Sequence, residues 1–168
     1  MEASNKIFPV HSSYLDYLSN NFSFTFPSGV STNMSFIVFL SQSKNNLSRS
    51  IPQFLCNSSQ LLVLDVSYNH LNGMITECLT HSGSIAVLNL QHNKFYGNIP
   101  DKFPVSCALS TLDLNSNKLW GLIPKSIANC TSLEVLDLRN NHVDDAFPYF
   151  LNIISILCVL VLRWNKFH

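Results

Sequence analysis

The sequence predicts an α/β repeat solenoid, a fold in which similar coils stack side by side along one axis. The stretch Leu109–Pro124, LSTLDLNSNKLWGLIP, recurs in related form through most of the chain. Its central residue, Asn117, has equivalents at a regular step of 24 residues. Leucines stand at fixed offsets from it, in the pattern L-x-x-L-x-L-x-x-N-x-L. A period of about 20–29 residues with this pattern is typical of a leucine-rich repeat, so we predict a horseshoe of about seven coils.

The recurring asparagine predicts a ladder of polar side chains that runs through the stack. An amide side chain both donates and accepts hydrogen bonds, so it can satisfy backbone groups where each strand turns. An apolar residue there would leave buried backbone groups unpaired, at about 1–3 kcal/mol for each group. The ladder positions are Asn20, Asn45, Asn69, Asn93, Asn117, Asn141 and Asn165.

The leucines predict where the core lies. Side chains alternate across a strand, so Leu112 and Leu114 point the same way. One coil cannot bury them, but stacked coils can, and the strands then form a parallel sheet on the concave side. Stretches between the strands, such as Lys125–Asn129, are expected to form short helical or 3₁₀ turns on the convex side. Gly121 permits a tight backbone path after the strand.

The repeat pattern also sets the expected domain limits. Residues 1–11 carry no pattern and are predicted to be a disordered stub, whereas residues 12–168 form one leucine-rich repeat domain with a truncated last coil. The apolar run Phe147–Leu162 is shorter than the roughly 20 residues of a membrane span, and it keeps the repeat phase. We therefore interpret it as part of a coil.

Three positions depart from the repeat template. Gln42 occupies an inward position, and Arg49 replaces the usual glycine. In coil six, Asp145-Ala146-Phe147-Pro148 replaces Gly-x-Ile-Pro, and we interpret the pair Asp144-Asp145 as a solvated turn.

Composition excludes several classes of protein. Ten basic and ten acidic residues give a net charge of zero, which argues against nucleic-acid binding, because that favours clustered lysine and arginine. A hydrophobic content of 46% argues against a disordered chain. The first residues contain no apolar run of a secretory signal, so the chain shows neither a signal peptide nor a span. No nucleophile motif, phosphate loop, cofactor motif or zinc spacing is present, so we expect no enzyme activity, no cofactor and no metal.

Outward strand positions form columns that cross the coils, and we expect them to line a concave binding face. One column is rich in aspartate and another, just past the asparagine ladder, is rich in lysine and histidine. Aromatic residues between them are candidate contact anchors. The alternative is that the charged residues only keep the face soluble. The candidate ligand-binding residues are Asp65, Tyr68, His70, His92, Lys94, Asp113, Lys118, Asp137, Arg139, His142, Arg163 and Trp164.

Five cysteines leave at least one thiol unpaired within the chain. Cys107 and Cys130 are 23 residues apart, one short of a coil, so they can approach closely enough for a disulfide. Cys56 and Cys78 are two residues out of phase, which makes them the weaker candidate pair. Buried free thiols are the alternative.

Asn-x-Ser/Thr sequons provide candidate glycosylation sites, which matter only if the chain enters the secretory pathway. They begin at Asn21, Asn33, Asn46, Asn57 and Asn129.

Three segments point to a family. LNLQHNKFYGNIP, LDLNSNKLWGLIP and LDVSYNHLNGMIT share a Gly-x-Ile ending that resembles the plant-specific class of leucine-rich repeats. Residues 126–168 are similar to plant receptor-like proteins, which are cell-surface immune receptors. The resemblance implies an ectodomain segment at the extracellular side of the plasma membrane, without catalysis. It also implies a peptide, protein or glycan ligand, a co-receptor kinase as partner, and a role in defence or developmental signalling.

Two other functions stay open. Some plant leucine-rich repeat proteins are secreted inhibitors of cell-wall hydrolases. The chain also ends before the expected Gly-x-Ile-Pro of its last coil and carries no terminal caps, which is consistent with a non-functional truncated product or a fragment.

Overall fold

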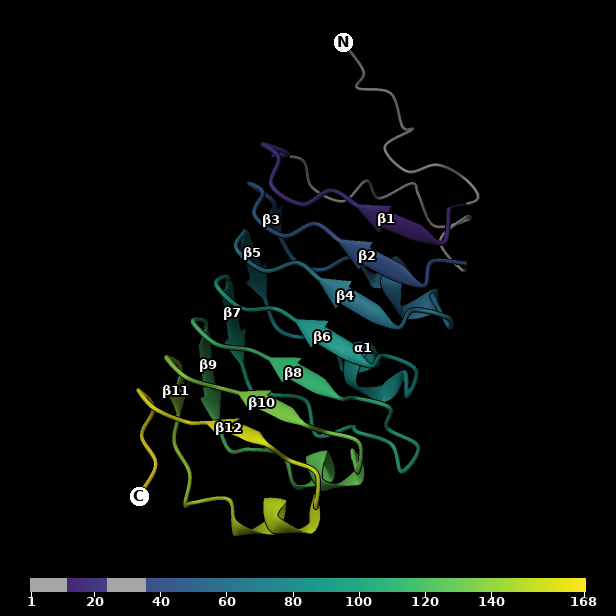
Figure 1. Cartoon of the computed structure of the whole chain (residues 1–168). Coiled ribbons are helices and arrows are strands. Elements are labelled where there is room, and N and C mark those ends of the chain that lie inside the picture. Colours follow the sequence, from purple (N-terminus) through teal and green to yellow (C-terminus); the bar gives the residue numbers. More distant parts are fainter. Residues whose placement is uncertain (1–11, 24–35) are drawn as a thin grey trace.

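The computed structural model describes residues 12–23 and 36–168. Within them, seven coils stack side by side, and each contributes one short strand to a seven-stranded parallel sheet, the first sheet (Figure 1). Leu64 pairs in register with Leu88, and Leu88 with Leu112, so coil-equivalent residues face each other. The predicted fold class is thereby confirmed. The strands are β1 (Tyr14–Asp16), β2 (Phe39–Ser41), β4 (Val63–Asp65), β6 (Val87–Asn89), β8 (Thr111–Asp113), β10 (Val135–Asp137) and β12 (Val159–Val161).

A second parallel sheet, which the sequence analysis did not foresee, runs beside the first (Figure 1). Its register differs, because Tyr96 pairs with Lys118 rather than with the coil-equivalent Trp120. Coil-equivalent residues are thus offset by two positions along its strands. Its strands are β3 (Ser48–Arg49), β5 (His70–Gly73), β7 (Lys94–Gly97), β9 (Lys118–Gly121) and β11 (His142–Val143).

Short helical turns connect the second sheet to the next strand of the first. They lie toward the amino ends of the first-sheet strands, whereas the second sheet lies toward their carboxyl ends (Figure 1). The turn expected at Lys125–Asn129 is a 3₁₀ helix with these bounds. Among the described residues, no helix has the length and apolar character needed to cross a membrane. The helical elements are η1 (Gln53–Asn57), α1 (Glu77–His81), η2 (Lys125–Asn129) and η3 (Tyr149–Ile153).

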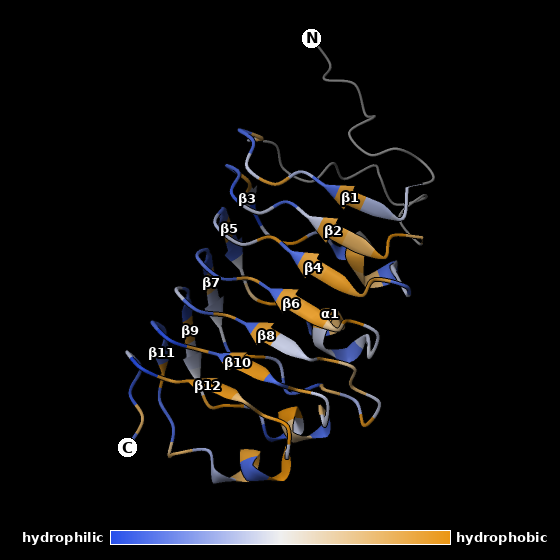
Figure 2. Cartoon of the chain, in the orientation of Figure 1, coloured by the Kyte–Doolittle hydropathy of each residue, from blue (hydrophilic) through white to orange (hydrophobic). Residues whose placement is uncertain are grey.

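The core is a continuous column of leucines between the two sheets and the helical turns. Leu112 and Leu114 are buried as the strand alternation predicts, and Leu109 and Leu119 turn inward beside them. Figure 2 shows that most strands of the first sheet are largely apolar, while β1 and β8 are paler, and that hydrophilic turns follow at the carboxyl ends. Because each coil buries its leucines only against its neighbours, stability is distributed along the stack.

The predicted asparagine ladder is present, and Asn117 shows its pattern. Its Nδ2 donates to the carbonyls of Leu114 and Asn115 in its own coil, at 3.1 and 3.2 Å, and to Leu90 of the preceding coil, at 3.0 Å. Its Oδ1 accepts the N–H of Phe95 at 3.0 Å. Asn20, in the first coil, is exposed, and its two described hydrogen bonds stay within that coil.

Two disulfides join neighbouring coils on the side of the helical turns. Cys107 and Cys130 are bonded, with 4.7 Å between their Cα atoms. Cys56 and Cys78, the weaker candidate pair from the sequence, are bonded as well, with 5.3 Å between Cα atoms. Cys56 lies near the end of the 3₁₀ helix η1, and Cys78 lies near the start of the α-helix α1. Cys158 is free and exposed.

Arg49 has a left-handed backbone conformation, which favours glycine. Its φ is +71°, whereas Gly73, Gly97 and Gly121 at the equivalent positions have φ between +85° and +93°. We expect Arg49→Gly to stabilise the chain by about 1 kcal/mol, since relief of the left-handed strain outweighs the added freedom of the unfolded chain. Urea unfolding checks this. Arg49→Ala, which keeps the strain, should give no gain, and an equal gain from both changes would contradict the explanation.

Candidate ligand-binding face

The outward side of the first sheet carries four columns of side chains. The first column was missed by the sequence analysis, although strand alternation predicts it. It is mostly apolar, and its first two rings stack with centroids 4.2 Å apart. The column consists of Tyr14, Phe39, Val63, Val87, Thr111, Val135 and Val159.

The second column contains the predicted aspartates, and each of them accepts a hydrogen bond from the backbone of its own coil. Oδ1 of Asp65 accepts the N–H of Ser67 at 2.9 Å, and Oδ1 of Asp113 accepts that of Asn115 at 3.0 Å. Asp137 accepts the N–H of Arg139 in the same way, at 3.0 Å. Each carboxylate therefore fixes the turn that follows its strand.

Burial raises the pKa of Asp113 above its ordinary value, and the neighbouring Asp137 adds to this rise. Hydrogen bonds from Asn115 oppose it. The pKa of Asp113 is thus higher in the folded chain than in the unfolded chain, so its ionised form lowers the free energy of unfolding. This loss is absent at pH values below the unfolded pKa and grows as the pH rises from the unfolded to the folded pKa. A cationic ligand group near Asp113 would remove this cost.

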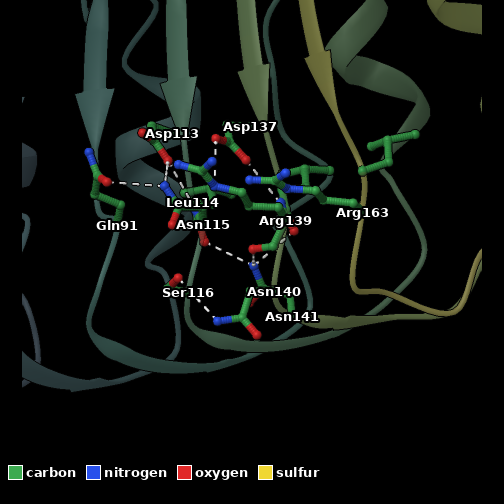
Figure 3. A network of polar contacts seen from close by, with 12 residues as sticks. Gln91, Asp113, Leu114, Asn115, Ser116, Asp137, Arg139, Asn140, Asn141 and Arg163 are labelled. Atoms are coloured by element: carbon green, nitrogen blue, oxygen red, sulfur yellow. Dashed lines mark hydrogen bonds and ion pairs between the residues drawn. The ribbon is translucent and has the colours of Figure 1, made fainter.

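The third column changes from neutral to basic along the stack. Asn115 donates to Oε1 of Gln91 at 3.1 Å, and Nε of Arg139 lies 3.2 Å from Oδ2 of Asp137 (Figure 3). In the last coil Val161 takes the aspartate position, so Arg163 has no ion-pair partner among the described residues. Its guanidinium instead lies 4.6 Å from the centre of the Trp164 ring.

The fourth column stands directly before the asparagine ladder, and every member has a left-handed backbone. Tyr68 and His92 are exposed and stack with ring centroids 4.3 Å apart. Trp164 is 67% exposed at the far end. The column consists of Ser19, Lys44, Tyr68, His92, Ser116, Asn140 and Trp164, with φ between +51° and +58°.

Four predicted site residues do not lie on this face. His70, Lys94, Lys118 and His142 are the first residues of β5, β7, β9 and β11, so they belong to the second sheet. The chain turns at the left-handed residue and the ladder asparagine, and this turn redirects the following side chain. The structure therefore brings together Asp65, Tyr68, His92, Asp113, Asp137, Arg139, Arg163 and Trp164.

In the coil-six departure, Asp144 is solvated as expected, whereas Asp145 makes a structural contact. Oδ2 of half-buried Asp145 accepts the N–H of Ile123 at 2.9 Å. Asp144 is exposed and lies 3.8 Å from Nδ1 of His168. In the described part of the chain, no three His, Cys, Asp or Glu side chains are grouped as metal ligands.

The sequons differ in accessibility. Asn21, Asn46 and Asn57 are exposed, whereas Asn129 is half-buried and its Nδ2 donates to the carbonyl of Phe103 at 2.8 Å. Asn33 lies outside the described residues.

The comparisons agree with this geometry. The family model for the leucine rich repeat matches residues 108–130 and 132–153. No curated protein matches the sequence. Among solved structures, the chain is similar to the Arabidopsis receptor kinase HAESA in complex with the peptide hormone IDA and the co-receptor SERK1. The identity is 29% and the TM-score 0.87, over 92% of this chain and 26% of that one.

Two further solved structures are similar to this chain. The leucine-rich repeat ectodomain of the membrane receptor kinase GASSHO1/SCHENGEN3 from Arabidopsis thaliana is 30% identical, with a TM-score of 0.86, over 92% of this chain and 18% of that one. A plant ice-binding protein is 26% identical, with a TM-score of 0.74, over 92% and 57%. The chain thus spans about a quarter or less of the length of the two receptors. The repeat, the family model and these likenesses show that the chain is a leucine-rich repeat solenoid similar to a stretch of plant receptor kinase ectodomain.

Proposed function

We propose that this chain is a non-catalytic ligand-binding module of a plant cell-surface receptor, and that an extended peptide lies across its first sheet. One observation carries the proposal. The outward side of that sheet carries four columns of side chains over seven coils, and aromatic rings are exposed along the fourth of them, whereas Ser43, Ser67 and Asn115 of the third are buried. An open face of this length suits an extended ligand better than a compact one. The likeness to HAESA, which was solved with a peptide hormone, supports the same class of ligand.

The charges on the face favour one orientation of the ligand. Asp65 and Asp113 lie on coils three and five, whereas Arg163 lies on coil seven with no ion-pair partner in the described part of the chain. A ligand with a cationic group over coils three to five and a carboxylate at coil seven would complement both. Trp164, beside Arg163, supplies an apolar contact at the same end.

The disulfides support an extracellular setting for the proposed receptor. Disulfides form and persist in oxidising compartments, and two of them join neighbouring coils in this chain. We propose a location on the extracellular side of the plasma membrane, with a co-receptor kinase as partner and a role in defence or developmental signalling. Among the sequons that the structure describes, Asn21, Asn46 and Asn57 are the exposed positions for N-glycosylation in that setting.

Selection from a phage-displayed library of short linear peptides, with the whole chain as bait, tests the proposed function. We expect the selected peptides to share a carboxylate near one end. Arg163→Gln should weaken their binding about tenfold, because a charge-assisted hydrogen bond is worth about 1.5–3 kcal/mol. Tyr68→Ala should weaken it severalfold, since an exposed aromatic anchor is lost.

A matched control is Lys102→Gln, which removes an exposed cation outside both sheets. Binding should be unchanged in this variant. Peptides that bind Arg163→Gln and Tyr68→Ala as well as the unmodified chain would contradict the proposed site. Inhibition of a fungal cell-wall hydrolase, with no peptide selected, would favour the inhibitor class instead.

A further inference from the structure

In coils three to five, the two sheets present different charged side chains. The first sheet presents Asp65 and Asp113. The second sheet presents His70 in coil three, Lys94 in coil four and Lys118 in coil five, and no acidic side chain in these coils. We call its outward side the lateral face, defined by His70, Asn72, Lys94, Tyr96, Lys118 and Trp120. All six side chains are exposed, while Leu71, Phe95 and Leu119 between them are buried.

The lateral face keeps its cations free for a ligand. Neither Lys94 nor Lys118 has an ion-pair partner among the described residues. The acidic side chain that follows along the sheet, Asp144 of coil six, lies 3.8 Å from His168 instead. Positive charge on coils three to five is therefore not neutralised by the chain itself.

In the second sheet, aromatic rings lie opposite Lys118 and His142, whereas Lys94 pairs with Asn72 and lies two residues before Tyr96 in its own strand. Lys118 pairs across the strands with Tyr96, and His142 pairs with Trp120. Tyr96 is 50% exposed and Trp120 is 52% exposed, although both are large apolar side chains. Trp120 also lines an open groove of about 640 Å³ that continues to Leu122 and Phe147. The face thus alternates cations with accessible rings.

We propose that the lateral face binds an acidic polysaccharide, a linear polyuronate. Each sugar of such a chain carries one carboxylate and one apolar face of C–H groups. The carboxylates complement Lys94 and Lys118, while the C–H faces pack on the rings of Tyr96 and Trp120. Partly desolvated charge pairs and buried aromatic area supply the binding energy. This site is on a different face from the proposed peptide site and does not depend on it.

Other polyanions fit this face less well. Nucleic acid favours a dense cluster of lysine and arginine, whereas the lateral face offers two lysines and a histidine over three coils. An extended acidic peptide would direct a charge to the sheet only at every second residue, about 6.6 Å apart, and would offer no C–H face to Trp120. A neutral glycan would leave both lysines without partners.

Isothermal titration of the whole chain with polygalacturonate tests the proposal. We expect saturable binding that weakens with added salt, because exposed charge pairs are screened. The double variant Lys94→Gln/Lys118→Gln should lose about tenfold or more in affinity, and Trp120→Ala about fivefold. Fully methyl-esterified polygalacturonate, which has the same sugars without the carboxylates, should not bind.

The controls separate this site from general charge effects. Lys102→Gln should bind polygalacturonate as the unmodified chain does, and so should Arg163→Gln on the first sheet. Circular dichroism melts of all variants should coincide, since every changed side chain is exposed. Equal loss in Lys102→Gln, tighter binding of single-stranded DNA than of polygalacturonate, or full binding by the double variant would each overturn the proposal.

Discussion

Asn117→Ala should lower the free energy of unfolding by about 3–5 kcal/mol, among the largest effects of any single substitution in this chain. The amide makes four hydrogen bonds in a buried position. Its loss leaves the N–H of Phe95 without that acceptor inside the stack, where an unpaired group costs about 1–3 kcal/mol. It also removes three hydrogen bonds to carbonyls, of which that of Leu90 keeps the bond from Asn93. Urea unfolding followed by circular dichroism measures the change.

Hydrogen exchange can assign this loss to the ladder. The amide of Phe95 donates to Asn117, whereas the amide of Leu119 donates to Asn141. In Asn117→Ala, Phe95 should lose protection more strongly than Leu119. Asn152→Ala removes an exposed asparagine in η3 and should change the stability by less than about 0.5 kcal/mol. A similar loss in both variants would contradict a special role for the ladder.

The repeat period predicts the features that depend only on spacing. The ladder, the inward leucines, the first sheet and the 3₁₀ turn at Lys125–Asn129 all follow from residues that recur at 24-residue steps. The ladder asparagine and most inward leucines are needed at the same position in every coil, and the turn lies at a fixed distance from them. The period therefore constrains them strongly, and the structure agrees.

The period does not reveal the direction of the chain after the ladder. Lys94 directly follows Asn93, so spacing alone cannot tell whether it continues the first sheet or begins another. The preceding residue, His92, has a left-handed backbone, with φ of +52°, and this turn sends Lys94 to the second sheet. Tyr68 and Trp164 adopt the same conformation, which L-residues with bulky side chains rarely do. The identities of these two residues therefore do not predict the left-handed conformation.

Hydrogen bonds made by surface side chains were equally hidden in the sequence. Asp113 and Asp137 were expected to belong to an acidic column that contacts a ligand, but each also accepts a hydrogen bond from the backbone two residues later. Asp145 was expected to be solvated and instead holds Ile123 of the preceding coil. A short acidic side chain can serve a ligand or its own backbone, and the pattern alone does not separate these uses.

Gln42→Leu should raise the free energy of unfolding by about 2–4 kcal/mol, which is unusual for a single substitution. Gln42 is 1% exposed, and neither Nε2 nor Oε1 has a hydrogen-bond partner among the described residues. Buried polar atoms without partners cost about 1–3 kcal/mol each. The equivalent residues in later coils are apolar and fully buried, so a leucine fits the template. They are Val66, Leu90, Leu114 and Leu138.

The backbone at Gln42 should be unaffected by this change. Its carbonyl accepts hydrogen bonds from Asn45 and Asn69, and both bonds are independent of the side chain. Gln91→Leu is the matched control, because half-buried Gln91 accepts a hydrogen bond from Asn115. This control should give no stabilisation, since Nδ2 of Asn115 loses that acceptor. Urea unfolding could instead find Gln42→Leu neutral or destabilising. The side-chain amide of Gln42 must then have a hydrogen-bond partner that offsets the cost of its burial, and this contact would stabilise the second coil.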